Sequence, residues 1–571
     1  MAFLPLWLRQ YQRRDLSDDA LAGTITAILL VPQALAYALL AGLPPEVGLY
    51  ASIIPPIIYA LTGSSRTLAV GPVAVAAVMV AAALANFAQG DPALALAGAL
   101  WLSFLSGVFL LLFAALRLGW LSHFVSHPVL NGFSTGAAIT IIGTQLPTLL
   151  GISISSQHAF IGAINALLPE LSKTQQLTLI SGATVILLLL ISRHWLASWL
   201  KHLGMSASSA GLTTRVTPLL IVVLAILLSM HFDGAAHLAV VGGIPAGLPM
   251  PSLAFLWVPG WQSLVSSALL IALIAYVESL SVAKLLAMRR RQRIDANQEL
   301  MALGSTNIAS SIVGGMPVAG GFARSMVNFE AGAKTQLASI ITASWVALAA
   351  LVFSSGLAPL PKTVLAAIVV VAVTQLIDLR SILTTWRYDK RDGLSQVATV
   401  IGVLVLGIEP GLMIGIGLAL ILYLHRTSNP HIAVIGQLAG TEHFRNVLRY
   451  SVQTWPSLLI VRIDENLYFA NTPQVESQLL SLVADHPHAK HLVLVLSGVA
   501  AIDASGLELL ESLHVSLSEA GIQLHLAEVK GPVMDRLQST HFMRTLNPSH
   551  IYLSTHQAVN HLIQSSSEAT L

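Results

Sequence analysis

Long runs of apolar residues follow one another from Ala20 to Tyr423, and short polar segments separate them. A helix that crosses the hydrocarbon core of a bilayer needs about 20 apolar residues, each adding about 1.5 Å. On this criterion the pattern predicts about fourteen membrane spans, as in a polytopic α-helical membrane protein. The approximate spans are 20–41, 47–62, 72–86, 95–116, 128–149, 176–192, 216–231, 262–287, 297–313, 319–330, 336–356, 363–377, 394–408 and 411–425.

After Arg426 the pattern changes to short, branched-rich runs that alternate with polar residues, as a soluble domain requires. Strands are predicted at 458–464, 491–496 and 522–527, and helices at 472–483, 505–520 and 529–538. This order indicates an α/β layer structure, which the topology predicted below places in the cytoplasm. We therefore divide the chain into an amphipathic N-terminus (1–19), a transmembrane domain (20–426), and an α/β domain with its tail (427–571).

Composition supports the membrane assignment, since 55% of the residues are hydrophobic and only 10% are charged. Soluble domains carry about 25% charged residues. A net charge of +2 does not fit a protein that neutralises nucleic-acid phosphates. The chain has no cysteine, which excludes disulfides, thiol nucleophiles and thiolate metal sites. We expect the lipid bilayer as a partner, and no cofactor, metal site or nucleic acid.

Basic residues gather on one side of the predicted topology, with Lys173 and Lys362 as exceptions, and this is typical of cytoplasmic loops. They include Arg9, Arg13, Arg14, Arg66, Arg117, Arg193, Lys201, Arg289, Arg290, Arg291, Arg293, Lys334, Arg380, Arg387, Lys390, Arg391 and Arg426. This predicts a multi-pass protein of the cell (inner) membrane with both termini in the cytoplasm. At the N-terminus, Ser17–Asp19 is expected to cap the first long helix.

Two apolar segments are too short or too interrupted for simple spans, and they occupy comparable places in the two halves. They are Arg66–Ala85, with AVGPVAVAAV, and Gly314–Val327, with GGMPVAGGFARS. Each has an extended lead-in with glycine and a proline suited to the first turn of a helix. We predict two half-helices whose N-termini face one point inside the membrane, where an anion would bind. The alternative is that each Gly-Pro pair only kinks an ordinary span.

Arg324 lies in the second interrupted segment, and Ser325 beside it can donate a hydroxyl. An arginine inside a membrane usually faces a cavity or a partner, because its insertion costs several kcal/mol. It is a candidate anion ligand. The alternative is an arginine whose side chain extends to the lipid headgroups.

Glu278 is the second ionisable residue whose insertion into the membrane costs free energy. It lies about ten residues before the basic cluster at Arg289, and so about 15 Å from the cytoplasmic face. Burial and the arrival of an anion can change the protonation of such a carboxylate. Glu278 is therefore a candidate proton-coupling group. The alternative is a structural glutamate paired with Lys284 or with a helix terminus.

Together these residues resemble the SulP family of anion transporters, the sulfate permease superfamily. The segments that carry the resemblance are AILLVPQALAYALLAGLPPEVGLYASIIPPIIYALTGSSRTLAVGPVA, HPVLNGF, ESLSVAK and DANQELMALGSTNIASSIVGGMPVAGGFARSMVN. The C-terminal IDASGLELLESL resembles the strand-to-helix signature of a STAS domain. Ser505 in this motif matches a serine that is phosphorylated in related domains, although an N-cap role is the favoured interpretation.

The resemblance implies seven plus seven helices in an inverted repeat, divided into core and gate domains as in the uracil transporter, and a homodimer. It places the substrate between the third and tenth helices. The implied substrate-binding residues are Gln33, Tyr37, Val73, Ala74, Ala319, Gly320, Gly321, Phe322, Arg324 and Ser325. Glu278 and Arg324 match the pair in plant-type proton-coupled sulfate transporters. Ala323 and Ala319 depart from the family pattern, because hydroxyl residues are frequent at these positions.

We therefore expect a transporter and not an enzyme. The first hypothesis is a secondary active anion transporter, a proton-coupled sulfate symporter that holds the anion between the two half-helix N-termini. Bicarbonate or a dicarboxylate, coupled to sodium or to protons, is the alternative substrate. An uncoupled anion channel or exchanger and a membrane receptor are the other hypotheses.

Overall fold

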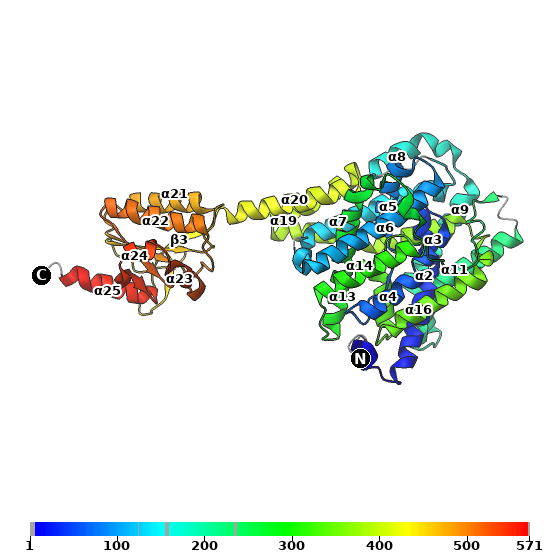
Figure 1. Ribbon diagram of the computed structural model, residues 1–571, viewed down its shortest axis with the longest axis horizontal. Coiled ribbons are helices and arrows are strands. Elements are labelled where there is room, and N and C mark those ends of the chain that lie inside the picture. The colour runs from blue at the N-terminus through cyan, green and yellow to red at the C-terminus, as the bar shows by residue number, and fades with distance from the viewer. Residues whose placement is uncertain (1–5, 124, 155–158, 233–236, 569–571) are drawn as a thin grey trace. The chain divides into compact units, whose positions relative to one another are not determined.

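The computed structural model describes residues 6–123, 125–154, 159–232 and 237–568. Contacts divide the chain into two compact units, Met1–Ala419 and Leu420–Leu571, each of which is described by itself (Figure 1). The division falls inside the helix Ile408–Thr427, close to the predicted boundary at Arg426.

The first unit is built from packed helices (Figure 1). Within the described residues, seven helical segments are long and apolar enough to cross a membrane, and three shorter apolar helices accompany them. The helices are α1 (Leu6–Arg9), α2 (Asp15–Leu40), α3 (Pro45–Tyr50), α4 (Ile54–Thr62), α5 (Ala74–Ala88), α6 (Pro92–Ala115), α7 (His127–Leu150), α8 (Phe160–Leu167), α9 (Gln176–Ile191), α10 (Ala197–His202), α11 (Ala207–His231), α13 (Val265–Arg289), α14 (Ala296–Ile312), α15 (Phe322–Glu330), α16 (Leu337–Leu348), α17 (Lys362–Val373), α18 (Leu379–Tyr388), α19 (Lys390–Leu406) and α20 (Ile408–Thr427).

Each predicted span overlaps one of these helices, and the second span is broken into α3 and α4. The break precedes Pro55 and Pro56, which lack amide hydrogens and fit only the first turn of a helix. The predicted cap at Ser17–Asp19 is wrong, because α2 already begins at Asp15 and has no side-chain cap.

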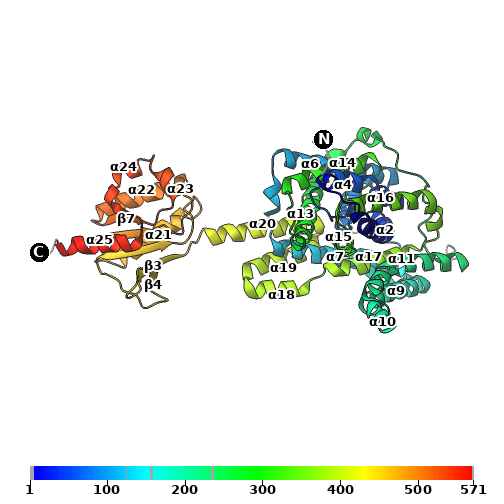
Figure 2. The same ribbon diagram turned by 90° about the horizontal axis from the view of Figure 1, so that it is seen from below.

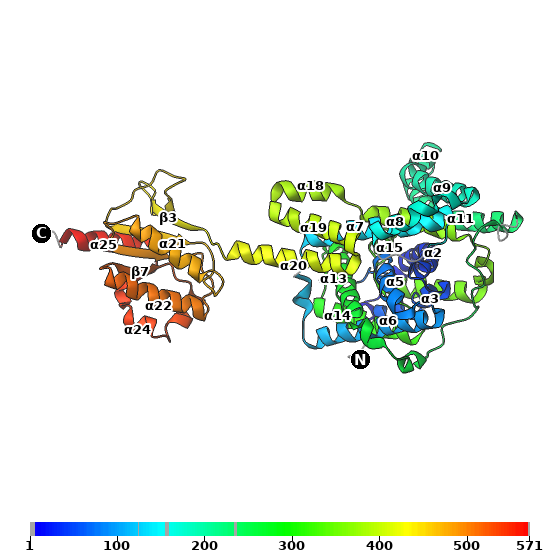
Figure 3. The ribbon, with the colours of Figure 1, turned by 90° about the horizontal axis from the view of Figure 1, so that it is seen from above.

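The helical segment from α17 to α19 is broken twice, at Ile377–Asp378 and at Asp389. The short 3-10 turn Thr374–Leu376 (η8) follows α17, Ile377 is extended, and Asp378 is outside the helical region. Asp378 then caps α18 by accepting a hydrogen bond from the Ser381 amide at 2.9 Å. Figures 2 and 3 both show α18 alongside α19.

The second unit is a six-stranded sheet with strand order β4-β3-β5-β6-β7-β8, in which β5 to β8 are parallel and β3 is antiparallel to β4 and β5. Its strands are β3 (Ile432–Gln437), β4 (Phe444–Asn446), β5 (Leu458–Ile463), β6 (His491–Val495), β7 (Gln523–Ala527) and β8 (Ile551–Tyr552). Its helices are α21 (Thr472–Ala484), α22 (Ala504–Glu519), α23 (Gly531–Leu537), α24 (Phe542–Thr545) and α25 (Thr555–Glu568).

Period-two alternation divides the strand residues between two cores. Leu492, Leu494 and Leu526 pack in one core with residues of α21 and α22, whereas Val493 packs in the other with residues of α25. The three predicted strands and three predicted helices are confirmed within two residues. The segment before Leu458 holds β3 and β4, which the sequence analysis missed.

Ser505 does not cap α22, so the favoured interpretation of this residue is wrong. The helix begins at Ala504, and Asp503 is the N-cap, since its carboxylate accepts a hydrogen bond from the Gly506 amide at 2.9 Å. Ser505 lies half-buried in the first turn. Its predicted regulatory role stays a prediction.

A histidine cluster lies on the α25 side of the sheet. His525 on β7 is 1% exposed, and its Nε2 lies 3.1 Å from Nδ1 of His491. The rings of His525 and His550 have centroids 4.3 Å apart. Burial, followed by the nearby His550 and His491, lowers the pKa of His525 from 6.5 to about 3. The folded domain therefore holds His525 neutral.

We expect acid to destabilise this unit through His525. Because the pKa of His525 is lower in the folded domain than in the unfolded chain, protonation favours the unfolded chain. The free energy of unfolding is therefore unaffected by this group above pH 6.5 and decreases as the pH falls from 6.5 toward 3. Thermal unfolding of the fragment from Leu420 onward should therefore show a Tm that falls over this range. His525→Gln should flatten the fall, and the exposed His488→Gln should not. An equal fall in His525→Gln would contradict this assignment.

Candidate functional site

Two short strands pair where the two interrupted segments of the first unit meet, a place called the crossing below. β1 (Val70–Gly71) pairs antiparallel with β2 (Ala319–Gly320), and α5 and α15 begin two or three residues after them. The helix N-termini of the two interrupted segments therefore lie together, as predicted. The placement of the prolines in the first turns is wrong, because Pro72 precedes the N-cap Val73 and Pro317 precedes β2.

Buried side chains satisfy the backbone of this crossing, as non-helical chain inside a membrane requires. The amide of Asn307 pairs with Val318 as a neighbouring strand would: it donates to the carbonyl at 3.0 Å and accepts from the N–H at 3.0 Å. The Ser279 hydroxyl accepts from the Gly320 N–H at 2.7 Å. These three elements, α14, α13 and β2, are therefore fixed to one another.

We expect Asn307→Ala to loosen β2. Each buried backbone group of Val318 left without a partner costs about 1–3 kcal/mol, so the variant should unfold at a lower temperature in detergent and bind anion more weakly. The control is Ser305→Ala on the same helix, since that hydroxyl bonds only to carbonyls of its own helix. Equal behaviour of the two variants would remove Asn307 from this role.

Arg324, in the first turn of α15, is 3% exposed. Its guanidinium donates to backbone carbonyls of Ala69 at 3.3 Å, Pro72 at 3.1 Å and Ala319 at 3.5 Å. Among the described residues, no carboxylate lies within 4.0 Å of it. A Cβ atom on Gly71 would lie only 3.2 Å from Nη2 of Arg324. Glycine at position 71 therefore leaves room for the guanidinium beside β1. The alternative of a headgroup-facing arginine does not fit this burial.

A small cavity lies between the N-termini of α5 and α15. The volume that the centres of water molecules can occupy in it is about 60 Å³. The N-caps of α5 and α15, Val73 and Gly321, provide no side-chain hydrogen bond to the first-turn amides. Figure 2 shows α2, α15 and α17 close together. The cavity is lined by Gln33, Tyr37, Pro72, Val73, Ala74, Val75, Glu278, Gly321, Phe322, Ala323, Arg324, Ala372, Val373, Gln375 and Leu376.

Most of the predicted site residues meet at this cavity. Gln33, Tyr37, Val73, Ala74, Gly321, Phe322, Arg324 and the predicted coupling residue Glu278 line it. Ala319, Gly320 and Ser325 do not. The Ser325 hydroxyl is fully buried and accepts from the Ala69 N–H at 2.9 Å, so it supports the crossing from behind.

The end of α17 and η8 form one wall of the cavity, which was not predicted from the sequence. Ala372, Val373, Gln375 and Leu376 belong to this wall. The run TVLAAIVVVAV gives no sign of which side faces a cavity. Gln375 is the one polar lining residue among the four, and its place at the end of an apolar run is the signal that could have identified it.

Glu278 projects from α13 and lines the cavity with Arg324. In the described part of the chain its carboxylate has no hydrogen-bond partner, and no ion pair with Lys284 is found. Lys284 is exposed. The structural pairing considered as an alternative is therefore not present, and the carboxylate is available to a proton.

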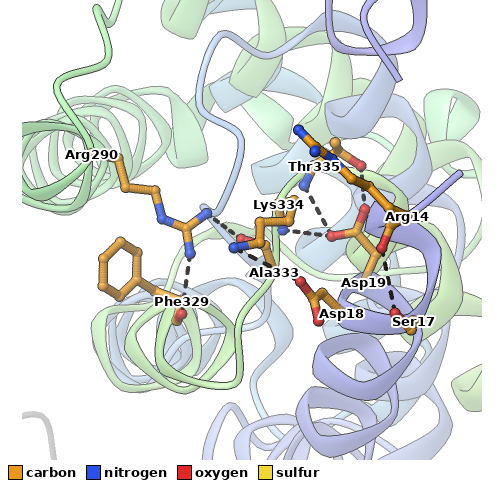
Figure 4. Close-up of polar contacts among 9 residues, drawn as sticks. All are labelled: Arg14, Ser17, Asp18, Asp19, Arg290, Phe329, Ala333, Lys334 and Thr335. Carbon is orange, nitrogen blue, oxygen red and sulfur yellow. Dashed lines mark hydrogen bonds and ion pairs between the residues drawn. The ribbon is translucent and has the colours of Figure 1, made fainter. Parts of the chain in front are cut away.

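The segment after α15 is tied to two of the cavity-lining helices (Figure 4). Asp19 of α2 is fully buried, and its carboxylate accepts hydrogen bonds from the Lys334 N–H at 2.6 Å and the Thr335 hydroxyl at 2.6 Å. Arg290, next to the end of α13, donates to the carbonyls of Phe329 and Ala333. The ends of α2, α13 and α15 are thus joined, which fixes the helices that bear the lining residues.

Comparison with known proteins gives matches along nearly the whole chain. A family model described as the sulfate permease family matches residues 16–399, and one described as the STAS domain matches residues 449–558. The probable sulfate transporter 4.2 of Arabidopsis thaliana is 34% identical over 566 residues, which cover 97% of this chain and 82% of the relative. A probable sulfate transporter of Mycobacterium tuberculosis is 33% identical over 556 residues, which cover 96% of each chain.

Solved structures share the fold. The overall structure of SLC26A9 superposes with a TM-score of 0.90 at 23% identity, covering 100% of this chain and 93% of that one. The transmembrane domain of BicA, described as a cyanobacterium bicarbonate transporter, gives a TM-score of 0.60 at 23% identity and covers 71% of this chain and 98% of that one.

Proposed function

Because the chain belongs to the sulfate permease family and ends in a STAS domain, we propose that it is a secondary active anion transporter that carries sulfate together with protons. The observation that supports this most strongly is the positive character of the cavity. Among the described residues no carboxylate lies within 4.0 Å of the buried Arg324 guanidinium, although Glu278 lines the same cavity. The guanidinium lies beside two helix N-termini that have no side-chain caps and also carry partial positive charge. An anion that enters would receive charge-assisted hydrogen bonds from the guanidinium and from first-turn amides.

Glu278 is proposed as the proton-coupling group. It lines the same cavity as Arg324, so its charge acts on the same anion. A protonated Glu278 favours a bound anion, and an ionised Glu278 repels it. Proton release to the opposite side would then accompany anion release.

Bicarbonate is the second candidate substrate, favoured by one feature of the lining. Among the lining residues, Tyr37 alone has a hydroxyl group. Ala323 also lines the cavity, at a position where the family often has a hydroxyl residue. Fewer donors suit a less highly charged anion. Sodium is the alternative coupling ion, and an uncoupled channel or exchanger is the alternative mechanism.

Uptake of labelled sulfate into proteoliposomes tests the proposal. Concentrative uptake driven by an inward proton gradient is expected, and unlabelled sulfate should compete better than bicarbonate or a dicarboxylate. Better competition by bicarbonate would show that bicarbonate, and not sulfate, is the preferred substrate. Uptake driven only by a sodium gradient would show that sodium, and not the proton, is the coupling ion. An anion current with no dependence on either gradient would indicate a channel.

We propose a homodimer in the cell membrane with both termini in the cytoplasm. The STAS domain is assigned to regulation, and Ser505 is its proposed phosphorylation site. A phosphate there would lie at a helix N-terminus, where negative charge is stabilised. Phosphate incorporation that is lost in Ser505→Ala is the corresponding measurement.

Truncation after about His431 is expected to leave anion binding largely intact. All proposed ligands lie before residue 420, and the second unit has its own hydrophobic cores. Expression, dimer stability or transport rate can fall. Binding by the inserted, truncated protein should be compared with that of the full chain, and its complete loss would mean that the tail helps to build the site.

A further inference from the structure

The outer face of α18 is apolar and exposed, although the helix is tied to the protein on its inner face. Ser381 on the inner face accepts hydrogen bonds from Asn131 of α7 at 3.1 Å and Gln396 of α19 at 3.2 Å. On the other side, the exposed fractions are 58% for Leu379, 62% for Leu383 and 43% for Trp386. The helix therefore has a fixed position and an uncovered apolar surface.

The spacing of these three residues makes the surface continuous. They stand at positions i, i+4 and i+7, which lie within about 60° of one another at about 100° per residue. Arg380 and Arg387 are exposed on the next sector of the helix, and Thr384 is exposed beyond them. An apolar sector containing tryptophan, bordered by arginines, is the pattern of a helix that lies at a membrane surface.

The position of α18 in the chain identifies what covers this surface. One 18-residue window within Lys362–Tyr388, the segment that contains α17 and α18, is apolar enough to cross a membrane, and α19 follows at Lys390. Figure 3 shows α18 at the edge of the first unit, beside α19. Lys390 and Arg391 after the helix are also exposed. By the predicted topology this end faces the cytoplasm, where basic side chains contact lipid phosphates.

The helix is also close to the cavity along the chain. Gln375 and Leu376 of η8 line the cavity, and α18 begins at Leu379 after two non-helical residues. A displacement of α18 would therefore be transmitted to these two wall residues.

We propose that Leu379, Leu383 and Trp386 bind the cytoplasmic leaflet of the bilayer, and that this lipid contact holds the Gln375–Leu376 wall of the cavity in place. The first statement is independent of what the cavity binds. The second rests on the proposed function and adds lipid dependence to it.

The natural absence of cysteine makes the contact directly measurable in the full-length chain. Leu383→Cys and the adjacent control Thr384→Cys are labelled with an environment-sensitive fluorophore and reconstituted in phosphatidylcholine–phosphatidylglycerol vesicles. The label at position 383 is expected to emit at shorter wavelength and to be quenched by brominated acyl chains, and the label at 384 is not. Equal quenching at both positions would overturn the proposal. So would a shielded label at 383 that brominated lipid does not quench, since a second protein surface would then cover it.

Transport gives the second readout. The double variant Leu379→Asp, Leu383→Asp should take up sulfate several-fold more slowly than wild type, whereas Thr384→Asp should not. Unchanged uptake in the double variant would refute the link to the cavity wall. If the wild type itself carries no sulfate, the proposed function fails, and the fluorescence result still decides whether α18 binds lipid.

Discussion

Replacing Arg324 by alanine is expected to weaken anion binding about tenfold or more. One charge-assisted hydrogen bond contributes about 1.5–3 kcal/mol, and each 1.4 kcal/mol corresponds to about tenfold in affinity. The variant also leaves three backbone carbonyls without their guanidinium donor. Affinity should therefore be measured by equilibrium binding of sulfate, with thermal unfolding recorded on the same samples.

Two further variants separate binding from folding. Arg324→Lys keeps the positive charge but cannot reach three carbonyls with one ammonium group, so it should recover part of the affinity. Arg293→Ala removes an exposed cation from the loop before α14 and should change little. A folded Arg324→Ala protein with wild-type affinity would show that the guanidinium only supports the crossing.

Glu278→Gln is expected to abolish proton-driven, concentrative uptake while leaving anion binding detectable. Glutamine keeps the shape of the side chain but cannot take up and release a proton. The carboxylate lines the cavity without a hydrogen-bond partner among the described residues, so the change breaks no described structural bond. Uptake against an imposed pH gradient and equilibrium binding at fixed pH together measure the two properties.

The matched control is Glu330→Gln, an exposed carboxylate at the end of α15. It should retain pH-driven uptake. A wild-type pH dependence in Glu278→Gln would assign coupling to another group. Restoration of uptake by a sodium gradient would show instead that sodium is the coupling ion.

Local chemistry in the sequence was enough to identify the two half-helices and the two costly residues, Arg324 and Glu278. Each of these signals lies within about one helical turn or one interrupted run, so no knowledge of the rest of the fold was needed. Gln33 and Tyr37 came from the family resemblance, because a glutamine and a tyrosine in a long apolar helix indicate no partner by themselves.

The parts that the sequence could not predict depend on distant partners. Asp19 was interpreted as a helix cap, but it binds Lys334 and Thr335, more than 300 residues away. Asn307 and Ser279 are polar residues within apolar helices, and nothing in the sequence around them indicates a partner. Their role is seen only in the fold, where they bind the backbone of Val318 and Gly320. The cap of α22 was assigned to Ser505, two residues from the true cap Asp503, because either side chain can accept the hydrogen bond.

The crossing of β1 and β2 also sets an order of events during synthesis. Its ladder joins Val70 to Gly320, and Ser325 binds the Ala69 amide across 256 positions. The first half-helix therefore enters the membrane long before the ribosome has made the partners of its lead-in. Until then its polar backbone lies in hydrocarbon without those hydrogen bonds, which is costly. Substitutions near Gly320 are thus expected to act on biogenesis as well, by prolonging the period in which the N-terminal half is exposed to quality-control proteases.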